Sequence, residues 1–277
     1  MVNSHSLTKS KMAPVILVCI LVGYPTVHAR MDNSRASRPH DDSNILSVVQ
    51  DDLEFLKEET VSIASHYEQP ISEAPSNVYV ITEEDIRHSG AVDLPTILRR
   101  IPGMEVMQTT AADFNVSIRG DNQLLANKLL VLIDGRSIYL DAQGVVFWKS
   151  IPVTIPEIKR IEVIKGPASA IYGFNAFDGV INIITKSPQD MDGMTAQVAG
   201  GEFDTLMASA IYVRKYENFG YRLSYGFDQT NRWDKRDALA FRSNKFNLQT
   251  LYDLTSGARL KLSGGLVDTG RLAFQSV

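Results

Sequence analysis

The residue types that most often carry catalysis or bind metals are sparse in this chain of 277 residues, and their spacing does not suit either task. The chain has five histidines: His5, His28, His40, His66 and His88. No two of them form a zinc-binding HExxH pair, and none follows the glycine-rich centre of the chain. A metal could bind loosely at His40-Asp41-Asp42, but a solvated charged run explains these residues better. The sequence therefore supports neither zinc hydrolysis nor a Ser-His-Asp triad.

Motifs for nucleotide and nucleic-acid binding are missing as well. The sequence holds no phosphate-binding GxxxxGK, and 28 basic against 32 acidic residues leave a formal net charge of −4 and no basic patch. The run Gly200-Gly201-Glu202-Phe203 resembles part of a cyclic-dinucleotide synthase motif, but it is one residue short and is typical of a hairpin turn. We therefore expect no enzyme, no cofactor and no nucleic-acid partner.

Residues 1–29 predict a cleaved export signal. Lys9 and Lys11 precede an apolar run at residues 13–22, and a small-residue site ends at Ala29. The run is too short to span a bilayer, and a buried core helix is the alternative. Cleavage would remove Cys19, the only cysteine, so the exported chain could form neither a disulfide nor a thiolate metal site.

Residues 30–76 predict a flexible extension ahead of a folded domain. Residues 30–44 are polar and show no apolar period, whereas Ile45, Val49, Leu53 and Leu56 recur at helical spacing. Residues 60–76 contain two prolines and are typical of an extended linker.

Residues 77–191 predict a compact α+β domain. We expect a helix that Thr82 caps and Gly90 ends, a second helix at 93–100, and strands at 78–81, 104–108, 115–119, 128–133, 160–165 and 179–186. In the fifth strand, alternation predicts Ile161 and Val163 in the core, with Arg160 and Glu162 on a polar surface.

Residues 192–277 predict long antiparallel strands with one apolar and one polar face. Tyr221, Leu223, Tyr225 and Phe227 alternate with Arg222, Ser224, Gly226 and Asp228, and similar alternation follows around residues 246–254 and 260–266. A soluble β-sandwich gives the same alternation. Aromatic residues near the strand ends, and connections of variable length, favour strands of a membrane-spanning β-barrel.

Three ordered motifs resemble the plug domain of TonB-dependent outer-membrane receptors. They lie at residues 117–120, 132–136 and 160–186, and the resemblance covers residue 59 to the end. The matching plug residues are Arg119, Gly120, Asp134, Gly135, Arg160, Glu162, Gly166, Pro167, Tyr172, Gly173, Gly179 and Asn182. They are expected to be structural, and a small soluble α+β domain remains the alternative explanation for them.

The resemblance implies an α+β plug domain followed by antiparallel strands of a transmembrane β-barrel, as in siderophore, cobalamin and colicin I receptors. It implies active uptake of a metal chelate such as an iron-siderophore, haem or cobalamin. The implied location is the outer membrane of a Gram-negative-type bacterium, with the plug in the barrel lumen and a periplasmic N-terminus. The implied partners are the TonB energy-coupling protein with its ExbB and ExbD subunits, the chelate and outer-membrane lipid.

Residues 59–63 resemble the TonB box, the extended segment that TonB binds. The segment comprises Glu59, Thr60, Val61, Ser62 and Ile63. Pairing by strand addition requires free backbone groups, so we expect the segment to be accessible and unpaired. An ordinary linker strand is the alternative.

By the order of the plug strands, residues 109–115, 121–127 and 139–148 are expected to form outward loops. The candidate ligand-binding residues in them are Asp113, Phe114, Asn122, Gln123, Tyr139, Asp141, Gln143, Phe147 and Trp148. Aromatic walls with a few polar groups suit small-ligand binding, although Phe147 and Trp148 could equally pack the plug against the barrel.

The five or six strands expected after residue 191 are far fewer than the 22 of the family's barrel. We therefore expect 192–277 to be the N-terminal part of a truncated barrel, from a truncated or split coding sequence. An exported plug-like binding module without transport, or a non-functional truncated receptor, are the alternatives. A signal transducer fits less well, because residues 30–58 are too short for a separate signalling domain.

Overall fold

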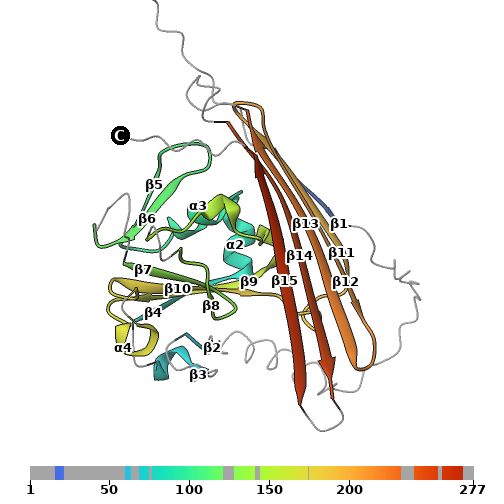
Figure 1. Cartoon of the computed structure of the whole chain (residues 1–277), viewed down its shortest axis with the longest axis horizontal. Helices are drawn as coiled ribbons and strands as arrows, with labels where there is room; N and C mark the ends of the chain where they lie inside the picture. Colours follow the sequence, from blue (N-terminus) through green and yellow to red (C-terminus); the bar gives the residue numbers. More distant parts are fainter. Residues whose placement is uncertain are drawn as a thin grey trace, which may run out of the picture.

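A computed structural model describes the chain at residues 16–21, 60–63, 69–74, 77–120, 128–140, 144–173, 175–231, 240–254 and 258–270. A small layered domain lies beside one tall, twisted sheet (Figure 1). Among the described residues, no helix has the length and apolar character needed to cross a membrane. The helix expected around residues 45–56 lies outside the described residues.

A five-stranded sheet forms the centre of the small domain. Its strands follow the order β4 (Val78–Thr82), β9 (Ile158–Lys165), β10 (Gly179–Thr185), β7 (Leu129–Ile133) and β8 (Arg136–Ser137). Only β10 and β7 run parallel; the other neighbours are antiparallel. The six strands expected in this domain all form, in this sheet or in a separate hairpin, and their bounds lie within two residues of the predicted ones.

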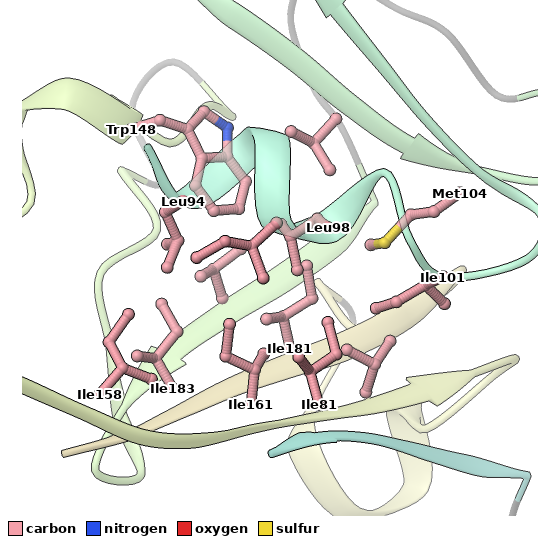
Figure 2. Packing of buried hydrophobic residues seen from close by; sticks show 14 of the residues in the cluster. Ile81, Leu94, Leu98, Ile101, Met104, Trp148, Ile158, Ile161, Ile181 and Ile183 are labelled. Atoms are coloured by element: carbon pink, nitrogen blue, oxygen red, sulfur yellow. The ribbon is translucent and has the colours of Figure 1, made fainter. Parts of the chain in front are cut away.

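Alternation along these strands gives the sheet two apolar faces. Val131, Ile161 and Ile181 belong to the larger cluster on one face, together with residues of α2 (Glu83–Ser89) and α3 (Leu94–Leu98). Figure 2 shows Ile161 and Ile181 of the sheet below Leu94 and Leu98 of α3. Leu130 and Val180 belong to a smaller cluster on the opposite face, beside α4 (Ser169–Tyr172). Because successive side chains of a strand point to opposite faces, one sheet supports both clusters.

The first helix begins and ends as its sequence predicts. The Thr82 hydroxyl accepts a hydrogen bond from the Asp85 amide at 3.1 Å, and the Asp85 carboxylate accepts one from the Thr82 amide at 3.0 Å. This reciprocal cap satisfies two amides that the helix leaves free. Gly90 ends the helix at φ +64°. The hydrogen bond from the Thr82 backbone is the main reason that the pKa of Asp85 lies below its usual value.

Two tight turns and one close contact depend on particular residues. Asp134 and Gly135 both have positive φ, which produces the two-residue hairpin between β7 and β8. Arg119 and Gly120 repeat this conformation after β6 (Phe114–Ile118), which pairs with β5 (Met104–Gln108). Gly179 fills a different need, because a Cβ there would lie 2.4 Å from the Ile164 carbonyl oxygen.

The tall sheet contains five consecutive antiparallel strands, which we call the wall. They are β11 (Gly193–Gly201), β12 (Thr205–Lys215), β13 (Phe219–Thr230), β14 (Phe241–Asp253) and β15 (Arg259–Gly270). The strands are 9 to 13 residues long, in line with the long antiparallel strands that the sequence predicts. The wall is open and does not close into a barrel (Figure 1).

Burial on the wall is the reverse of that in a water-soluble sheet. On β13, Arg222, Ser224 and Asp228 are buried, whereas Tyr225 is 46% exposed. The apolar face remains open on the neighbouring strands as well, with Leu248, Leu262 and Leu266 exposed. Polar residues thus face the small domain, and apolar residues face outward, as the strand alternation predicts for a barrel with a lipid-facing exterior.

Two segments adopt structure that the sequence does not predict. Residues in the apolar run of the expected export signal form β1 (Ile16–Leu21), which pairs with the free edge of β11. An unpaired strand edge accepts such an apolar, β-branched segment readily. In the expected linker, β2 (Thr60–Val61) pairs with β3 (Gln69–Pro70), and η1 (Ile71–Glu73) follows. The signal itself stays a prediction.

Candidate functional site

The segment that resembles a TonB box lies against the small domain instead of standing free. Val61 and Ile63 are buried, and Ile63 packs in the smaller cluster with Leu132 and Ile164. The prediction that this segment is accessible and unpaired is wrong for residues 60–63, because both apolar side chains are buried and β3 pairs with β2. Glu59 lies outside the described residues.

Glu162 holds this segment through its carboxylate. Its Oε2 atom accepts hydrogen bonds from the amides of Ser62 at 3.1 Å and Ile63 at 2.8 Å, and its Oε1 atom accepts one from Arg160 Nε at 2.8 Å. Glu162 is fully buried, so the expectation that it lies on a polar surface is wrong. The two amides lie about 100 residues earlier in the chain than Glu162.

Tyr172 provides the second polar contact to the segment. Its hydroxyl donates a hydrogen bond to the Ile63 carbonyl oxygen at 2.6 Å. Burial, and next the nearby charge of Glu162, raise the pKa of Tyr172, which keeps the phenol protonated and able to donate. The segment is therefore bound by one carboxylate, one phenol and an apolar pocket.

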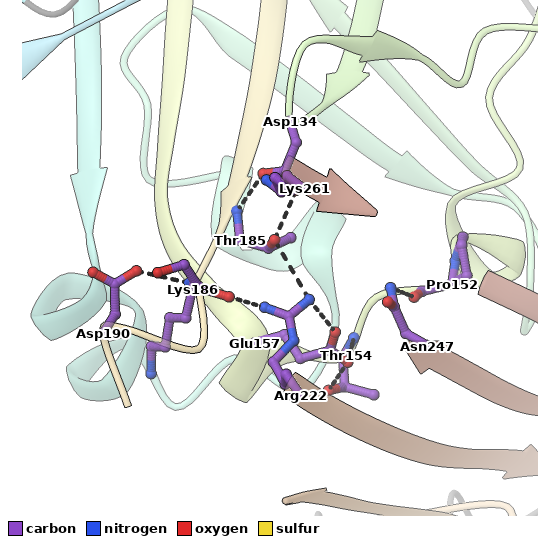
Figure 3. A network of polar contacts seen from close by, with 11 residues as sticks. Asp134, Pro152, Thr154, Glu157, Thr185, Lys186, Asp190, Arg222, Asn247 and Lys261 are labelled. Atoms are coloured by element: carbon purple, nitrogen blue, oxygen red, sulfur yellow. Dashed lines mark hydrogen bonds and ion pairs between the residues drawn. The ribbon is translucent and has the colours of Figure 1, made fainter. Parts of the chain in front are cut away.

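A buried ion pair joins the small domain to the wall (Figure 3). Arg222 Nη2 of β13 lies 3.2 Å from Glu157 Oε2, which belongs to η3 (Ile155–Glu157), and both side chains are 1% exposed. Arg222 also donates to the carbonyl of Lys186, the residue that follows β10. The other oxygen of Glu157 accepts hydrogen bonds from Thr154. Burial raises the pKa of Glu157 above its usual value, against the attraction of Arg222.

Three further contacts cross the same interface. Lys149 Nζ lies 2.8 Å from Asp228 Oδ2, Lys261 Nζ lies 3.2 Å from Asp134 Oδ2, and the Asn247 amide donates to the Pro152 carbonyl at 2.9 Å. A cavity of about 80 Å³ remains beside the first pair. Charged groups from β13 and β15, and a neutral amide from β14, thus meet charged or polar groups of the small domain.

Several residues that match the plug motifs make hydrogen bonds within the small domain, and their expected structural role stays a prediction. Asp134 accepts hydrogen bonds from the amide and the hydroxyl of Thr185, and the Gly135 amide donates to Asn182 Oδ1 at 3.1 Å. Arg119 donates to the Lys165 carbonyl at 3.4 Å, close to Gly166. These bonds join neighbouring strand ends and turns.

The candidate ligand residues that the structure describes do not gather in one place. Phe114 and Trp148 meet inside the larger cluster and are only 8% and 5% exposed. Tyr139 packs on the opposite sheet face, in the cluster that holds Ile63. Asp113 lies in its own turn, where its carboxylate accepts a hydrogen bond from Thr110. Phe147 precedes η2 (Trp148–Ser150). Asn122, Gln123, Asp141 and Gln143 lie outside the described residues.

The polar interface is the feature that sequence reasoning missed. Alternation places Arg222 and Asp228 on a polar face, but their partners Glu157 and Lys149 lie 65 to 79 residues away in sequence. Alternating charge on a barrel-like strand is the signal that points toward such partners. Within the described residues, no cluster of three or more histidine, cysteine or acidic residues is arranged to hold a metal.

Comparison with known proteins agrees with this architecture. Residues 70–180 match the model of the TonB-dependent receptor plug domain. The vitamin B12 transporter BtuB of Vibrio vulnificus is 35% identical over 195 residues, which cover 69% of this chain and 31% of that protein. BtuB of Vibrio cholerae is 35% identical over 154 residues, which cover 54% of this chain and 24% of that protein. The chain spans about a third of the length of these relatives or less.

Solved structures show the same fold. The siderophore receptor PirA from Pseudomonas aeruginosa aligns with a TM-score of 0.51 and 27% identity, over 72% of this chain and 36% of that one. The ferripyoverdine receptor of the same organism aligns with a TM-score of 0.62 over 76% of this chain and 27% of that one, at 18% identity.

These relatives are named as transporters and receptors. In this chain the residues that match the plug model come first, and the wall strands follow them. The chain is of the BtuB and siderophore-receptor kind and is not an enzyme. The chain carries a TonB-dependent receptor plug domain, followed by antiparallel strands that align with those of solved receptors.

Proposed function

We propose that this chain works in active uptake of a metal chelate across the outer membrane, with residues 59–63 as the segment that TonB binds. The observation that carries the proposal is the position of residues 60–63, bound to the plug through Glu162 and Tyr172. A segment held by a few hydrogen bonds at the end of a long extension is suited to a partner that captures extended backbone by strand addition.

The outward apolar face of the wall supports a place in lipid. Tyr225, Phe246, Leu248, Leu262 and Leu266 are 40% to 75% exposed. A soluble binding module would leave this surface in water, where apolar patches favour aggregation. We therefore propose the outer membrane as the location, reached through the export signal at residues 1–29, with the extension in the periplasm.

Cobalamin and ferric siderophores are the two ligand classes to test first. The proteins named BtuB are vitamin B12 transporters, and PirA is a siderophore receptor. Isothermal titration calorimetry of the protein in detergent separates these classes. Cyanocobalamin is titrated in one experiment and a ferric catecholate in another. Haem is the third probe.

Proline and alanine at position 61 test the coupling role. Val61→Pro removes a backbone donor and restricts φ, whereas Val61→Ala shortens the same side chain and keeps the backbone donor. If TonB captures this segment as a strand, Val61→Pro abolishes binding to the purified periplasmic domain of TonB in a pull-down, and Val61→Ala preserves it. Equal binding by both variants would contradict the assignment of the coupling segment.

A further inference from the structure

Aromatic side chains gather at one end of the outward face of the wall. The rings of Tyr212 and Tyr221 have centres 6.2 Å apart, and the rings of Phe219 and Tyr221 have centres 6.1 Å apart. Tyr216 and Tyr252 are exposed near the same strand ends. Rings with a polar edge suit the boundary between hydrocarbon and water, so we expect this end of the wall at a membrane interface.

Arg214 lies among these rings. It follows Tyr212 by two residues on β12, which puts both side chains on the outward face, and it lies directly across from Tyr221 of β13. Its Nε atom donates a hydrogen bond to the Tyr212 hydroxyl at 2.8 Å, and its Cζ atom lies 5.6 Å from the centre of the Tyr212 ring. The guanidinium is therefore oriented by one tyrosine, while its two terminal nitrogens remain available to an acceptor.

A carboxylate at the start of the neighbouring strand does not form an ion pair with Arg214. Asp192 precedes Gly193, whose partner on β12 is Val213. Its Oδ1 atom accepts a hydrogen bond from the Gly193 amide at 2.9 Å, and in the described part of the chain it makes no ion pair with Arg214. The acceptor that suits the terminal nitrogens of Arg214 thus comes from outside the described residues.

The position of Arg214 along the wall matches the level of lipid headgroups. Arg242 of β14 lies on the outward face at the opposite end, with its Cζ atom 5.3 Å from the centre of the Phe227 ring. Arg214 pairs with Tyr221 and Arg242 with Gln229, so eight residues of β13 separate the two levels. This is about 26 Å along a strand and about 20 Å across a membrane at a tilt of about 40°, close to the height of the apolar band of a barrel, roughly 25 Å. Arg214 therefore lies at an edge of the band and not at its middle.

The connections between strands indicate which edge this is. Near Arg214 the strands are joined through residues 216–218 and 254–258, whereas residues 231–240, the longest connection of the wall, join β13 and β14 near Arg242. Outer-membrane barrels have short periplasmic turns and longer extracellular connections. In the location proposed above, Arg214 is thus next to the headgroups of the periplasmic leaflet.

We propose that Arg214, oriented by Tyr212, forms a binding site for the phosphodiester of an anionic phospholipid. Phosphate oxygens match the guanidinium fork in two parallel hydrogen bonds. A positive charge without a carboxylate partner favours a headgroup of net negative charge. The neighbouring rings cover the first part of the acyl chains. The site rests on the membrane location proposed above, and it is independent of the uptake and TonB-binding roles.

Calorimetric titration with a short-chain lipid tests the site. Dihexanoyl phosphatidylglycerol is added, below its critical micelle concentration, to the full-length chain in a non-ionic detergent. Arg214→Gln should weaken binding about fivefold, the effect of one basic residue near a membrane surface. Arg214→Lys keeps the charge but loses the fork, so it should restore only part of the affinity.

Matched variants and ligands identify what is bound. Lys215→Gln removes the same charge from the next residue of β12, which lies on the inner face with Val213, and should leave binding unchanged. Tyr212→Phe removes the hydroxyl that orients the guanidinium but keeps the ring, and should weaken binding less than Arg214→Gln. Inorganic phosphate and dihexanoyl phosphatidylcholine, titrated separately, should both bind more weakly than phosphatidylglycerol.

The outcomes separate the lipid site from the membrane location. No binding by the wild type, unchanged binding in Arg214→Gln, or an equal loss in Lys215→Gln overturns the site. Inorganic phosphate that binds as tightly as phosphatidylglycerol overturns the lipid as its occupant. Flotation of the wild type with phosphatidylcholine vesicles measures the location by itself. Flotation without binding that depends on Arg214 overturns the site alone, whereas such binding without flotation supports the site and contradicts the location.

Discussion

Two buried glutamates, five residues apart, connect the plug to different parts of the chain. Glu157 meets Arg222 of the wall, and Glu162 meets the amides of Ser62 and Ile63. Both carboxylates are completely buried, and each is accompanied by hydrogen-bond donors. Buried carboxylates persist only where such partners offset their desolvation. The charge on each glutamate therefore has a specific structural role, and the two roles are separable by substitution.

The ionisation of Glu157 predicts a pH dependence of stability. Burial raises its pKa above 4.5, against the attraction of Arg222, so the folded protein holds this proton more tightly than the unfolded chain. Stability from this group is fully present below pH 4.5 and is lost as pH rises through the folded pKa. Thermal unfolding in detergent should show the wild type losing stability relative to Glu157→Gln as pH rises, by about 1.4 kcal/mol for each pH unit of the shift.

An exposed glutamate provides the control for this titration. Glu84 has a side chain that is 70% exposed on the surface of α2, so Glu84→Gln makes the same substitution at a carboxylate that is not buried. If the wild type instead gains stability relative to Glu157→Gln as pH rises, the attraction of Arg222 outweighs burial, and the pKa of Glu157 is lowered in the folded protein.

Gly179 predicts a steric effect at the start of β10. A Cβ at this position would meet the Ile164 carbonyl oxygen at 2.4 Å and the Ile118 side chain at 2.8 Å, and the carbonyl cannot move without disturbing β9. Gly179→Ala should destabilise the plug by about 1–3 kcal/mol, visible as faster hydrogen exchange in β9 and β10. Gly264→Ala in β15 has open space and should leave the plug unchanged.

At the scale of elements, β9 contacts several different parts of the plug. It pairs with β4 and β10, places Ile161 and Val163 in the larger cluster and Ile164 in the smaller one, and presents Glu162 to the amides of residues 62 and 63. A change in this strand is transmitted to both faces of the sheet.

Local signals in the sequence located these elements well. Thr82, Gly90 and the Asp134-Gly135 turn act on their own neighbours, so their effects follow from residue type. The contact between Glu162 and residues 62 and 63 does not follow from such local signals. Its hydrogen bonds join residues that are 99 and 100 positions apart in the sequence. Alternation predicts that Glu162 leaves the main core, but it does not identify what covers it. The ion pairs with the wall are unpredictable for the same reason.

The cap of α2 is the element whose stability is easiest to test. Thr82→Ala removes the hydroxyl that accepts from the Asp85 amide and should cost about 1 kcal/mol, measured as faster hydrogen exchange in α2. Because the pKa of Asp85 is lowered by the Thr82 amide, its contribution is present above pH 3.8 and is lost as pH falls through the folded pKa. Thr96→Ala in α3, whose hydroxyl has no hydrogen bond in the described structure, is the matched control. Equal exchange in both variants would contradict the cap.

At the scale of the whole molecule, the plug and the wall are joined by charges, and the outer face of the wall is apolar. Arg222, Asp228 and Lys261 face the plug, each with an opposite charge within 3.2 Å. The reverse face presents leucine and aromatic side chains. This division requires two different surroundings, a polar interior and an apolar exterior, and a lipid bilayer around a plugged barrel provides both.

Neighbouring residues on β15 test this division. Leu262 is 60% exposed on the outward face, and Ser263 next to it points to the plug side, as does Lys261. A lysine in the lipid-facing position should cost about 2–4 kcal/mol near the bilayer midplane, whereas a lysine on the inner face joins an existing charged surface. Leu262→Lys should therefore lower the fraction of refolded chain that floats with phosphatidylcholine vesicles, and Ser263→Lys should leave it near the wild-type value. Equal flotation of both variants would show that the outward face does not contact lipid, and the exposed leucines would then require a protein partner as their cover.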